Sequence, residues 1–515
     1  MGESEKQLTG PDLGAGIDDP RLGENDKLLG HANGEAVLLA KVGGEYVAVG
    51  ASCTHYGGPL AEGVIENGAV RCPWHHACFS LKTGEALRAP ALSPIACYDV
   101  DASAGKIRVG KKVERDPLSP TYPLPAERSP TQPSNVVIVG AGAAGSAAAE
   151  MLRRCGFTGD VTVIDGEEAS PYDRPNLSKD YLAGNAPEEW IPLRPADFYE
   201  QHRVTLRRSR VTRIDVAGKK VEVENGTPLS FDALLLATGA EPIHLQLPGE
   251  DQPHVHVLRS LVDSRSIIEA ARTSKRAVVI GGSFIGLETA ASLRARDVEV
   301  HVVAPESVPL ERVLGTELGT FIKSLHEEKG VVFHLGRKPK QIEKDAVILD
   351  DDTKLGADLV VLGVGVRPRT QLAEAAGLAM DKGVSVNEFL ETSAPGVYAA
   401  GDIARWPDPH SGSKIRVEHW VVAQRMGQTA ARNILGAREK FDQVPFFWSA
   451  HYDVSINYVG HAEQWDRTLV DGDAAKRDVT VKYEQGGKTL AVATIFRDEE
   501  SLRAELTMER ESARA

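Results

Sequence analysis

The spacing of hydrophobic and polar positions changes along this chain of 515 residues, and each change predicts a different kind of domain. Over residues 30–112, short apolar runs alternate with Gly-rich turns. The segment 35–49 predicts a β-hairpin with Gly43 and Gly44 at its turn. We therefore expect a small all-β domain over residues 1–112.

From Asn135 the pattern becomes that of alternating strands and helices. An apolar strand over 136–140 precedes a helix over 142–156 and a second strand over 160–165, which together predict a βαβ unit. The same pattern returns over 277–306. This duplication predicts two Rossmann-like α/β domains, the first formed by 135–257 and 383–442 and the second by 258–382.

Two further segments complete the expected organisation. Residues 113–134 are rich in Pro and Ser and predict an extended, fairly stiff linker. Alternating strand patterns over 446–460 and 477–498 predict a C-terminal α+β domain over 443–515, and we expect its polar tail, 508–515, to be disordered.

Composition narrows the classes of function. The formal net charge of −14 argues against binding of nucleic acid through a basic face. The sequence contains no apolar run long enough to cross a bilayer, and its polar start lacks the apolar core of a signal peptide, so we expect a cytoplasmic protein without a membrane span. The five cysteines are odd in number and none follows Cys155, which does not indicate a disulfide scaffold.

The first βαβ unit carries a dinucleotide fingerprint. Gly140, Gly142 and Gly145 form G-x-G-x-x-G directly after a strand and at the start of a helix. These glycines permit a tight turn, a close approach of the backbone to a pyrophosphate, and close packing of helix on strand. Asp165, twenty residues beyond Gly145, is placed to bind a ribose hydroxyl.

The second unit carries a variant of the same fingerprint. Gly281, Gly282 and Gly286 surround Ser283, which takes the place of the middle glycine. Glu306 lies twenty residues beyond Gly286, and an acidic residue there favours NADH over NADPH by repelling a 2′-phosphate.

Two short Cys-His motifs in the all-β region indicate an iron–sulfur cluster. Sixteen residues separate Cys53-Thr54-His55 from Cys72-Pro73-Trp74-His75. In a Rieske [2Fe–2S] cluster, two Cys hold one iron and two His hold the other, so Cys53, His55, Cys72 and His75 are the expected metal ligands. His76 is interpreted as a neighbour, and Cys78 and Cys97 receive no role.

Further motifs resemble the NADH-dependent ferredoxin reductases and apoptosis-inducing factor. The resemblance covers 135–515, and the all-β module makes the whole chain similar to the apoptosis-inducing-factor-like branch with its own Rieske domain. The motifs are Pro171–Lys179, Leu236–Ala240, Val397–Asp402, Val417–Trp420 and Phe447–Ser449. The resemblance implies a multidomain fold with a Rieske domain, FAD- and NAD-binding Rossmann-like domains and a C-terminal reductase domain, and homodimerisation.

The resemblance also implies roles for individual residues. Asp165 would bind the FAD adenosine ribose and Val211 the adenine, while Arg174, Pro175 and Lys179 would contact the flavin. Glu288 would pair with Lys179, and these two are the expected catalytic residues. The remaining cofactor contacts would be made by Gly239, Arg259 and Asp402 toward FAD, Gly365 and Glu418 near the nicotinamide, and His419, Trp420 and Trp448 at the isoalloxazine edge.

The sequence therefore favours an oxidoreductase that passes electrons from NADH through FAD to its Rieske cluster and on to an external one-electron acceptor such as an oxygenase. No Cys pair follows Cys155, which argues against a thiol–disulfide reductase. The linker would keep the cluster near the flavin without tight docking. Two alternatives remain open, an NADH-sensing signalling flavoprotein with slow turnover and a Rieske domain that serves as a docking module.

Overall fold

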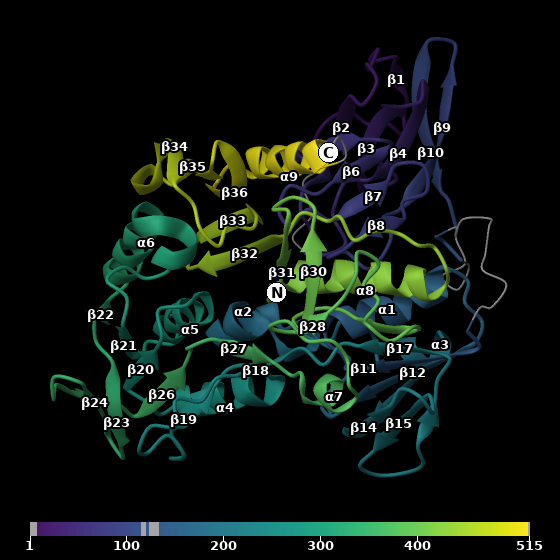
Figure 1. The fold of residues 1–515 in the computed structure, drawn as a ribbon. Helices are drawn as coiled ribbons and strands as arrows, with labels where there is room; N and C mark the ends of the chain where they lie inside the picture. The colour runs from purple at the N-terminus through teal and green to yellow at the C-terminus, as the bar shows by residue number, and fades with distance from the viewer. Residues whose placement is uncertain (1–7, 115–119, 123–132, 513–515) are drawn as a thin grey trace.

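The computed structural model describes residues 8–114, 120–122 and 133–512. It is a multidomain structure in which an all-β domain stands beside two α/β domains and a C-terminal α+β domain, as Figure 1 shows. This confirms the expected fold class. Most of the expected linker, 113–134, lies outside the described residues.

The N-terminal domain consists of two antiparallel sheets. The predicted hairpin is present as β3 and β4, with Gly43 and Gly44 at φ 62° and 81° in its turn. The first cluster motif, 53–55, follows β4 of the larger sheet, and the second, 72–75, lies between β6 and β7 of the smaller sheet. In spatial order the larger sheet is β1 (Ile17–Asp18), β10 (Lys106–Lys112), β9 (Cys97–Ser103), β4 (Glu45–Gly50), β3 (Glu35–Val42) and β2 (Lys27–Ala32), and the smaller is β5 (Val64–Glu66), β6 (Ala69–Arg71), β7 (Cys78–Ser80) and β8 (Ala86–Arg88).

Each α/β domain is built on a five-stranded parallel sheet, because continuous apolar strands buried on both faces favour parallel pairing. The first sheet has the order β13 (Val204–Arg208), β12 (Asp160–Asp165), β11 (Asn135–Val139), β17 (Ala233–Leu236) and β29 (Val397–Ala399). The second has the order β19 (Val255–Val257), β26 (Leu359–Leu362), β20 (Arg276–Ile280), β21 (Glu299–Ala304) and β22 (Val331–Leu335).

The principal helices belong to the two α/β domains. Helix α8 packs on α1, and Gly427 permits this contact because a Cβ there would lie 2.0 Å from the carbonyl oxygen of Ala144. The helices are α1 (Ala143–Arg154), α2 (Asp180–Ala183), α4 (Leu261–Ala271), α5 (Phe284–Arg294), α6 (Glu311–Glu328, interrupted at Gly315) and α8 (Trp420–Ile434).

Smaller elements connect these parts. Strands β18 (Ala240–Pro242) and β27 (Val366–Pro368) pair where the chain crosses between the α/β domains. The others are α3 (Phe198–Gln201), α7 (Gln371–Ala375), β14 (Val211–Asp215), β15 (Lys220–Val223), β16 (Leu229–Ser230), β23 (Pro339–Glu343), β24 (Ala346–Leu349), β25 (Lys354–Gly356), β28 (Val384–Ser385), β30 (Ala404–Asp408) and β31 (Ser413–Ile415).

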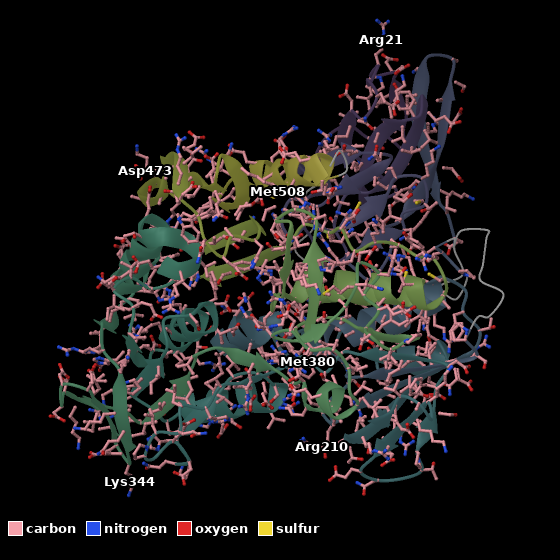
Figure 2. All side chains as sticks on the ribbon, viewed as in Figure 1. Arg21, Arg210, Lys344, Met380, Asp473 and Met508 are labelled. Atoms are coloured by element: carbon pink, nitrogen blue, oxygen red, sulfur yellow. The ribbon has the colours of Figure 1, made fainter. Side chains whose placement is uncertain are left out.

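The C-terminal domain corrects one expectation. Its antiparallel sheet has the order β32 (Phe446–His451), β33 (Val454–Gly460), β36 (Lys488–Ile495), β35 (Asp478–Gln485) and β34 (Arg467–Asp473). The expected disorder of the tail from Met508 is wrong through Ser512, because helix α9 spans Asp498–Ser512. Met508, labelled in Figure 2, is 5% exposed and belongs to a core cluster with Val421 and Phe446. Residues 513–515 lie outside the described part of the chain.

Membrane insertion through a helix finds no support in the structure. Within 8–114, 120–122 and 133–512, none of the helices combines the length and the apolar character needed to cross a bilayer.

Candidate functional site

A cavity of about 640 Å³ lies where the two α/β domains meet the C-terminal sheet. Its volume is in the range of sites for small molecules and cofactors. It brings together residues that are far apart in the sequence. Those of the predicted set that line it are Gly140, Gly142, Asp165, Arg174, Pro175, Lys179, Gly239, Arg259, Glu288, Gly365, Asp402, Glu418, His419, Trp420 and Trp448.

The first fingerprint has the backbone shape that a pyrophosphate requires. Gly140 has φ 104°, and a Cβ there would lie 2.3 Å from the carbonyl oxygen of Ala237. A Cβ on Gly145 would lie 1.9 Å from the carbonyl oxygen of Gly140. Gly142 instead faces open space and precedes α1 without a side-chain cap. The free N–H groups of that helix terminus fit an anionic group.

The second fingerprint differs in one respect. The Ser283 hydroxyl donates to the carbonyl oxygen of Gly363 at 2.6 Å and accepts from the Gly286 N–H at 3.2 Å. Its side chain therefore caps the start of α5, and glycine, which has no side chain, could not make this hydrogen bond. Ser283 still lines the cavity, so the start of α5 remains open to it.

Two of the lining residues, Lys179 and Glu288, form an ion pair. Lys179 Nζ lies 2.8 Å from Glu288 Oε2, as the resemblance implies. Glu288 also accepts hydrogen bonds from Ser178 at 2.5 Å and from Ser449 at 2.6 Å. The Glu288 side chain is 2% exposed and that of Lys179 is 15% exposed. The carboxylate is therefore buried, and the ammonium group lies between it and the cavity.

Further charged side chains pair with one another along the cavity. Arg259 donates to Asp402 Oδ2 at 2.8 Å, and Arg174 donates to the carbonyl oxygen of Arg259 at the same distance. Burial, together with the charge of nearby Glu167, raises the pKa of Asp165. These contacts fix the orientation of side chains that were predicted to hold FAD.

The cavity wall formed by α8 and β32 is aromatic. The His419 ring lies 4.6 Å from that of Phe447, and burial lowers the pKa of His419 to about 3. His419 Nδ1 is buried and lacks a hydrogen-bond partner within the described part of the chain. This unpaired buried nitrogen beside the cavity fits a site that a polar ligand completes.

Six predicted residues lie away from the cavity lining. Val211 is a half-buried residue of β14, and Glu306 follows β21. The others are glycines, of which Gly281 and Gly282 lie in the turn before α5, and Gly145 and Gly286 lie in the first turns of α1 and α5. Direct contacts of these residues with a nucleotide remain predictions: Gly145, Val211, Gly281, Gly282, Gly286 and Glu306.

The four predicted cluster ligands converge in the N-terminal domain. His55 Nδ1 and His75 Nδ1 lie 3.3 Å apart. A hydrogen bond joins the thiols of Cys53 and Cys72, lowering the pKa of the first and raising that of the second. Throughout the residues described, no three His, Cys, Asp or Glu side chains surround one point for a single ion, but a Rieske cluster needs only two protein ligands per iron. The donor set fits that cluster.

His76 faces away from this set. Its ring stacks on Phe446 at 4.0 Å, its Nδ1 lies 3.2 Å from Glu505 Oε2, and its Nε2 lies 3.2 Å from Ser501 Oγ. The side chain is thus engaged with β32 and α9, which supports His75 rather than His76 as the ligand.

The two histidine rings lie against aromatic side chains. The His75 ring lies 4.2 Å from that of Trp448, and the His55 ring lies 6.1 Å from it. Tyr56 stacks on His55 and donates a short hydrogen bond to Asp173 of the first α/β domain. Because Trp448 also lines the cavity, one indole contacts both sites.

A largely buried ionic network, which we call the docking network, joins the N-terminal domain to α8 and α9. It consists of Arg71, Arg88, Arg425, Glu505 and Glu509. Arg71 lies 3.1 Å from Glu505 and 2.7 Å from Glu509, and Arg88 lies 2.5 Å from Glu509. Arg425 of α8 lies 2.7 Å from Glu505. The domain is therefore docked by ion pairs in this structure, in addition to the linker that was expected to keep the cluster near the flavin without tight docking.

Sequence reasoning missed the docking network because its members carry no local signal. Burial alone would raise the pKa of Glu505, but Arg425, His76 and Arg71 hold it well below its ordinary value. The only hint in the sequence was the density of Glu and Arg after residue 498, which also suits a solvated tail.

Comparison with known protein families finds a match for each of three regions of the chain. Residues 134–427 match the pyridine nucleotide-disulphide oxidoreductase family, 19–99 the Rieske [2Fe-2S] domain and 446–513 the reductase C-terminal domain. The chain belongs to the pyridine nucleotide-disulphide oxidoreductase family. This confirms the resemblance, and with it an oxidoreductase whose cofactors are FAD, NADH and a Rieske [2Fe–2S] cluster.

Members of this family with similar sequences include two kinds of protein. Apoptosis-inducing factor 3 of Mus musculus is 33% identical over 476 residues, which cover 90% of this chain and 78% of the relative. The anthranilate 1,2-dioxygenase system ferredoxin–NAD(+) reductase component of Burkholderia cepacia is 35% identical over 365 residues, covering 70% of this chain and 90% of the relative.

Among solved structures, the covalent putidaredoxin reductase–putidaredoxin complex contains a similar chain. It has a TM-score of 0.71 and 34% sequence identity, and the match covers 73% of this chain and 93% of that one.

Proposed function

We propose that this protein passes electrons from NADH through FAD to its own Rieske cluster and then singly to an external acceptor protein, for example an oxygenase component. One observation carries the internal step. Trp448 lines the cavity that fits FAD, and its ring lies 4.2 Å from the ring of His75, a proposed cluster ligand. The two proposed redox sites therefore adjoin through a single side chain.

The residues around the cavity suit this reaction. A bound flavin accepts electrons from NADH as a pair and releases them one at a time. Lys179 Nζ lies 5.9 Å from the Trp448 ring and 2.8 Å from Glu288. Its charge would stabilise negative charge that develops beside this wall, and burial strengthens that effect. Glu288 holds the ammonium group in position.

The external acceptor is inferred from the relatives. A ferredoxin–NAD(+) reductase of a dioxygenase system and a reductase in complex with putidaredoxin are among the similar proteins. On this chain, Trp74 follows the ligand Cys72 and is 39% exposed. We place the acceptor on this side of the cluster because Trp448 covers the histidine side.

Anaerobic stopped-flow mixing with NADH tests the internal step. We expect the flavin absorbance to bleach first and the cluster signal to follow within the same turnover. Trp448→Leu should slow the second phase more than the first, while Trp190→Leu, at a site 68% exposed, should change neither. A cluster that stays oxidised through many turnovers would exclude the proposal. A long-lived reduced flavin with an NADH-dependent change in oligomeric state would favour the signalling alternative.

A further inference from the structure

A continuous chain of hydrogen-bonding side chains leads from the cavity into the C-terminal domain. We call Glu288, Ser449, His451, His326 and Tyr452 the relay chain. The successive distances are 2.6 Å from Ser449 Oγ to Glu288 Oε1, 3.1 Å from His451 Nε2 to Ser449 Oγ, 3.1 Å from His326 Nε2 to His451 Nδ1, and 3.3 Å from Tyr452 Oη to His326 Nδ1.

The relay chain joins a cavity residue to the surface through a buried part of the protein. Ser449, His451 and His326 are 0% exposed, and Glu288 is 3% exposed. Tyr452, in the turn between β32 and β33, is partly exposed. Buried polar groups are costly unless each finds a partner, and these four satisfy one another across α5, β32 and α6. Such a chain is more than packing requires, because apolar side chains could fill the same space.

The chemistry of its inner end sets the direction of every hydrogen bond. The Glu288 carboxylate, paired with Lys179, can only accept, so the Ser449 hydroxyl donates to it. His451 must then donate from Nε2 to Ser449 and accept at Nδ1 from His326 Nε2–H. His326 Nδ1 in turn accepts from the Tyr452 hydroxyl.

Both imidazoles are neutral, which allows each to accept a proton at one nitrogen and release one from the other. Burial, reinforced by the charge of Lys179, lowers the pKa of His451 to about 3. Burial and neighbouring His451 lower the pKa of His326 well below its ordinary value. At the outer end, Lys329 Nζ lies 5.8 Å from the Tyr452 ring, and burial raises the pKa of Tyr452.

The proposed function requires such a path. Each NADH that becomes NAD⁺ supplies two electrons and one proton, whereas the cluster and its acceptor take electrons one at a time. One proton per NADH must therefore leave the cavity for water. Resting on that function, we propose that the relay chain conducts this proton from Glu288 to Tyr452 and the solvent.

The transfer balances atom by atom. Protonated Glu288 gives its hydrogen to Ser449 Oγ, and Ser449 gives its own to His451 Nε2. His451 passes a proton from Nδ1 to His326 Nε2, and His326 passes one from Nδ1 to Tyr452, which releases one to water. At the end both rings carry hydrogen on Nε2 and Ser449 donates to Glu288. This is the hydrogen-bond order assigned above from the ionised Glu288, so it corresponds to the chain after a proton has left.

The first test needs no turnover. In selectively ¹⁵N-histidine-labelled holoprotein, NMR should show both His326 and His451 with hydrogen on Nε2 at neutral pH, assigned by the loss of each signal in His326→Gln and His451→Gln. Hydrogen on Nδ1 of either ring in the oxidised protein would overturn the hydrogen-bond order and the proposal with it.

The second test separates protons from electrons. Single-turnover mixing with NADH is followed by a pH-indicator dye and by flavin and cluster absorbance. His326→Gln and Ser449→Ala should slow proton release about tenfold or more relative to flavin reduction, and Ser449→Thr, which keeps the hydroxyl, should restore it. His301→Gln, at another hydrogen-bonded histidine pair with His334, is the control.

The outcomes are distinguishable. Proton release that keeps pace in both His326→Gln and Ser449→Ala would overturn the relay. A parent protein whose cluster is never reduced would overturn the proposed function, while the NMR experiment would still decide the order of the hydrogen bonds.

Discussion

Replacing Glu505 by Gln should weaken the attachment of the Rieske domain. The Glu505 side chain is 0% exposed and that of its partner Arg425 is 1% exposed. The Gln side chain has the shape of Glu but lacks its negative charge. Arg425 then loses its carboxylate partner, and Arg71 keeps only Glu509. Breaking a buried ion pair by removing one partner costs about 3–5 kcal/mol. We expect a loss of that size in the free energy of unfolding, measured by urea denaturation.

A matched variant on the same helix provides the control. Glu499 pairs with Arg503 at 2.5 Å, but these side chains are 58% and 64% exposed. Glu499→Gln should cost only about 0.3–0.5 kcal/mol, because solvent screens an exposed pair.

The same pair of variants tests the link to electron transfer. Glu505→Gln should slow reduction of the cluster after NADH addition while bleaching of the flavin keeps its rate, since no residue of the docking network lines the cavity. If Glu505→Gln and Glu499→Gln unfold at the same urea concentration and transfer electrons equally fast, the reasoning about the docking network is refuted.

Three further results are expected. Gly145→Ala should yield protein with little FAD, measured as the ratio of flavin to protein, because its Cβ would lie 1.9 Å from the Gly140 oxygen; normal flavin content would contradict the assignment. Burial lowers the pKa of His451 from 6.5 to about 3, so the unfolded chain binds a proton below pH 6.5 that the folded protein does not. His451 thus contributes stability that is fully present above that pH and is lost as the pH drops toward 3, by about 1.4 kcal/mol per pH unit. Other buried histidines, including His326 and His419, add to the total slope. His451→Leu should therefore reduce the slope by up to about 1.4 kcal/mol per pH unit in urea titrations between about pH 6 and pH 5, and an unchanged slope would disprove the shift. Trp74→Ala should slow reduction of an added one-electron acceptor without slowing reduction of the cluster, and equal rates would place the exit elsewhere.

The dinucleotide site and the iron–sulfur site could both be predicted from the sequence, because each depends on motifs only a few residues long. The glycines at 140, 142 and 145 shape one turn, and the Cys-His spacings at 53–55 and 72–75 fit two loops. Such motifs depend on backbone geometry over a few residues, which holds wherever the segment lies in the fold. The strand and helix periods likewise predicted the α/β duplication and the all-β domain.

Only the tertiary structure decided how these parts are joined. Arg71 and Glu505 lie 434 positions apart, and His326 and His451 lie 125 apart, so no periodicity connects either pair. The polar composition of 508–515 suggested a disordered tail, but in α9 Glu505 is buried and Glu509 is half-buried against arginines of other domains. The sequence determined which groups are present, whereas folding determined which of them are removed from water. That removal creates the docking network and the relay chain, because burial makes each charge or hydrogen bond depend on its partner.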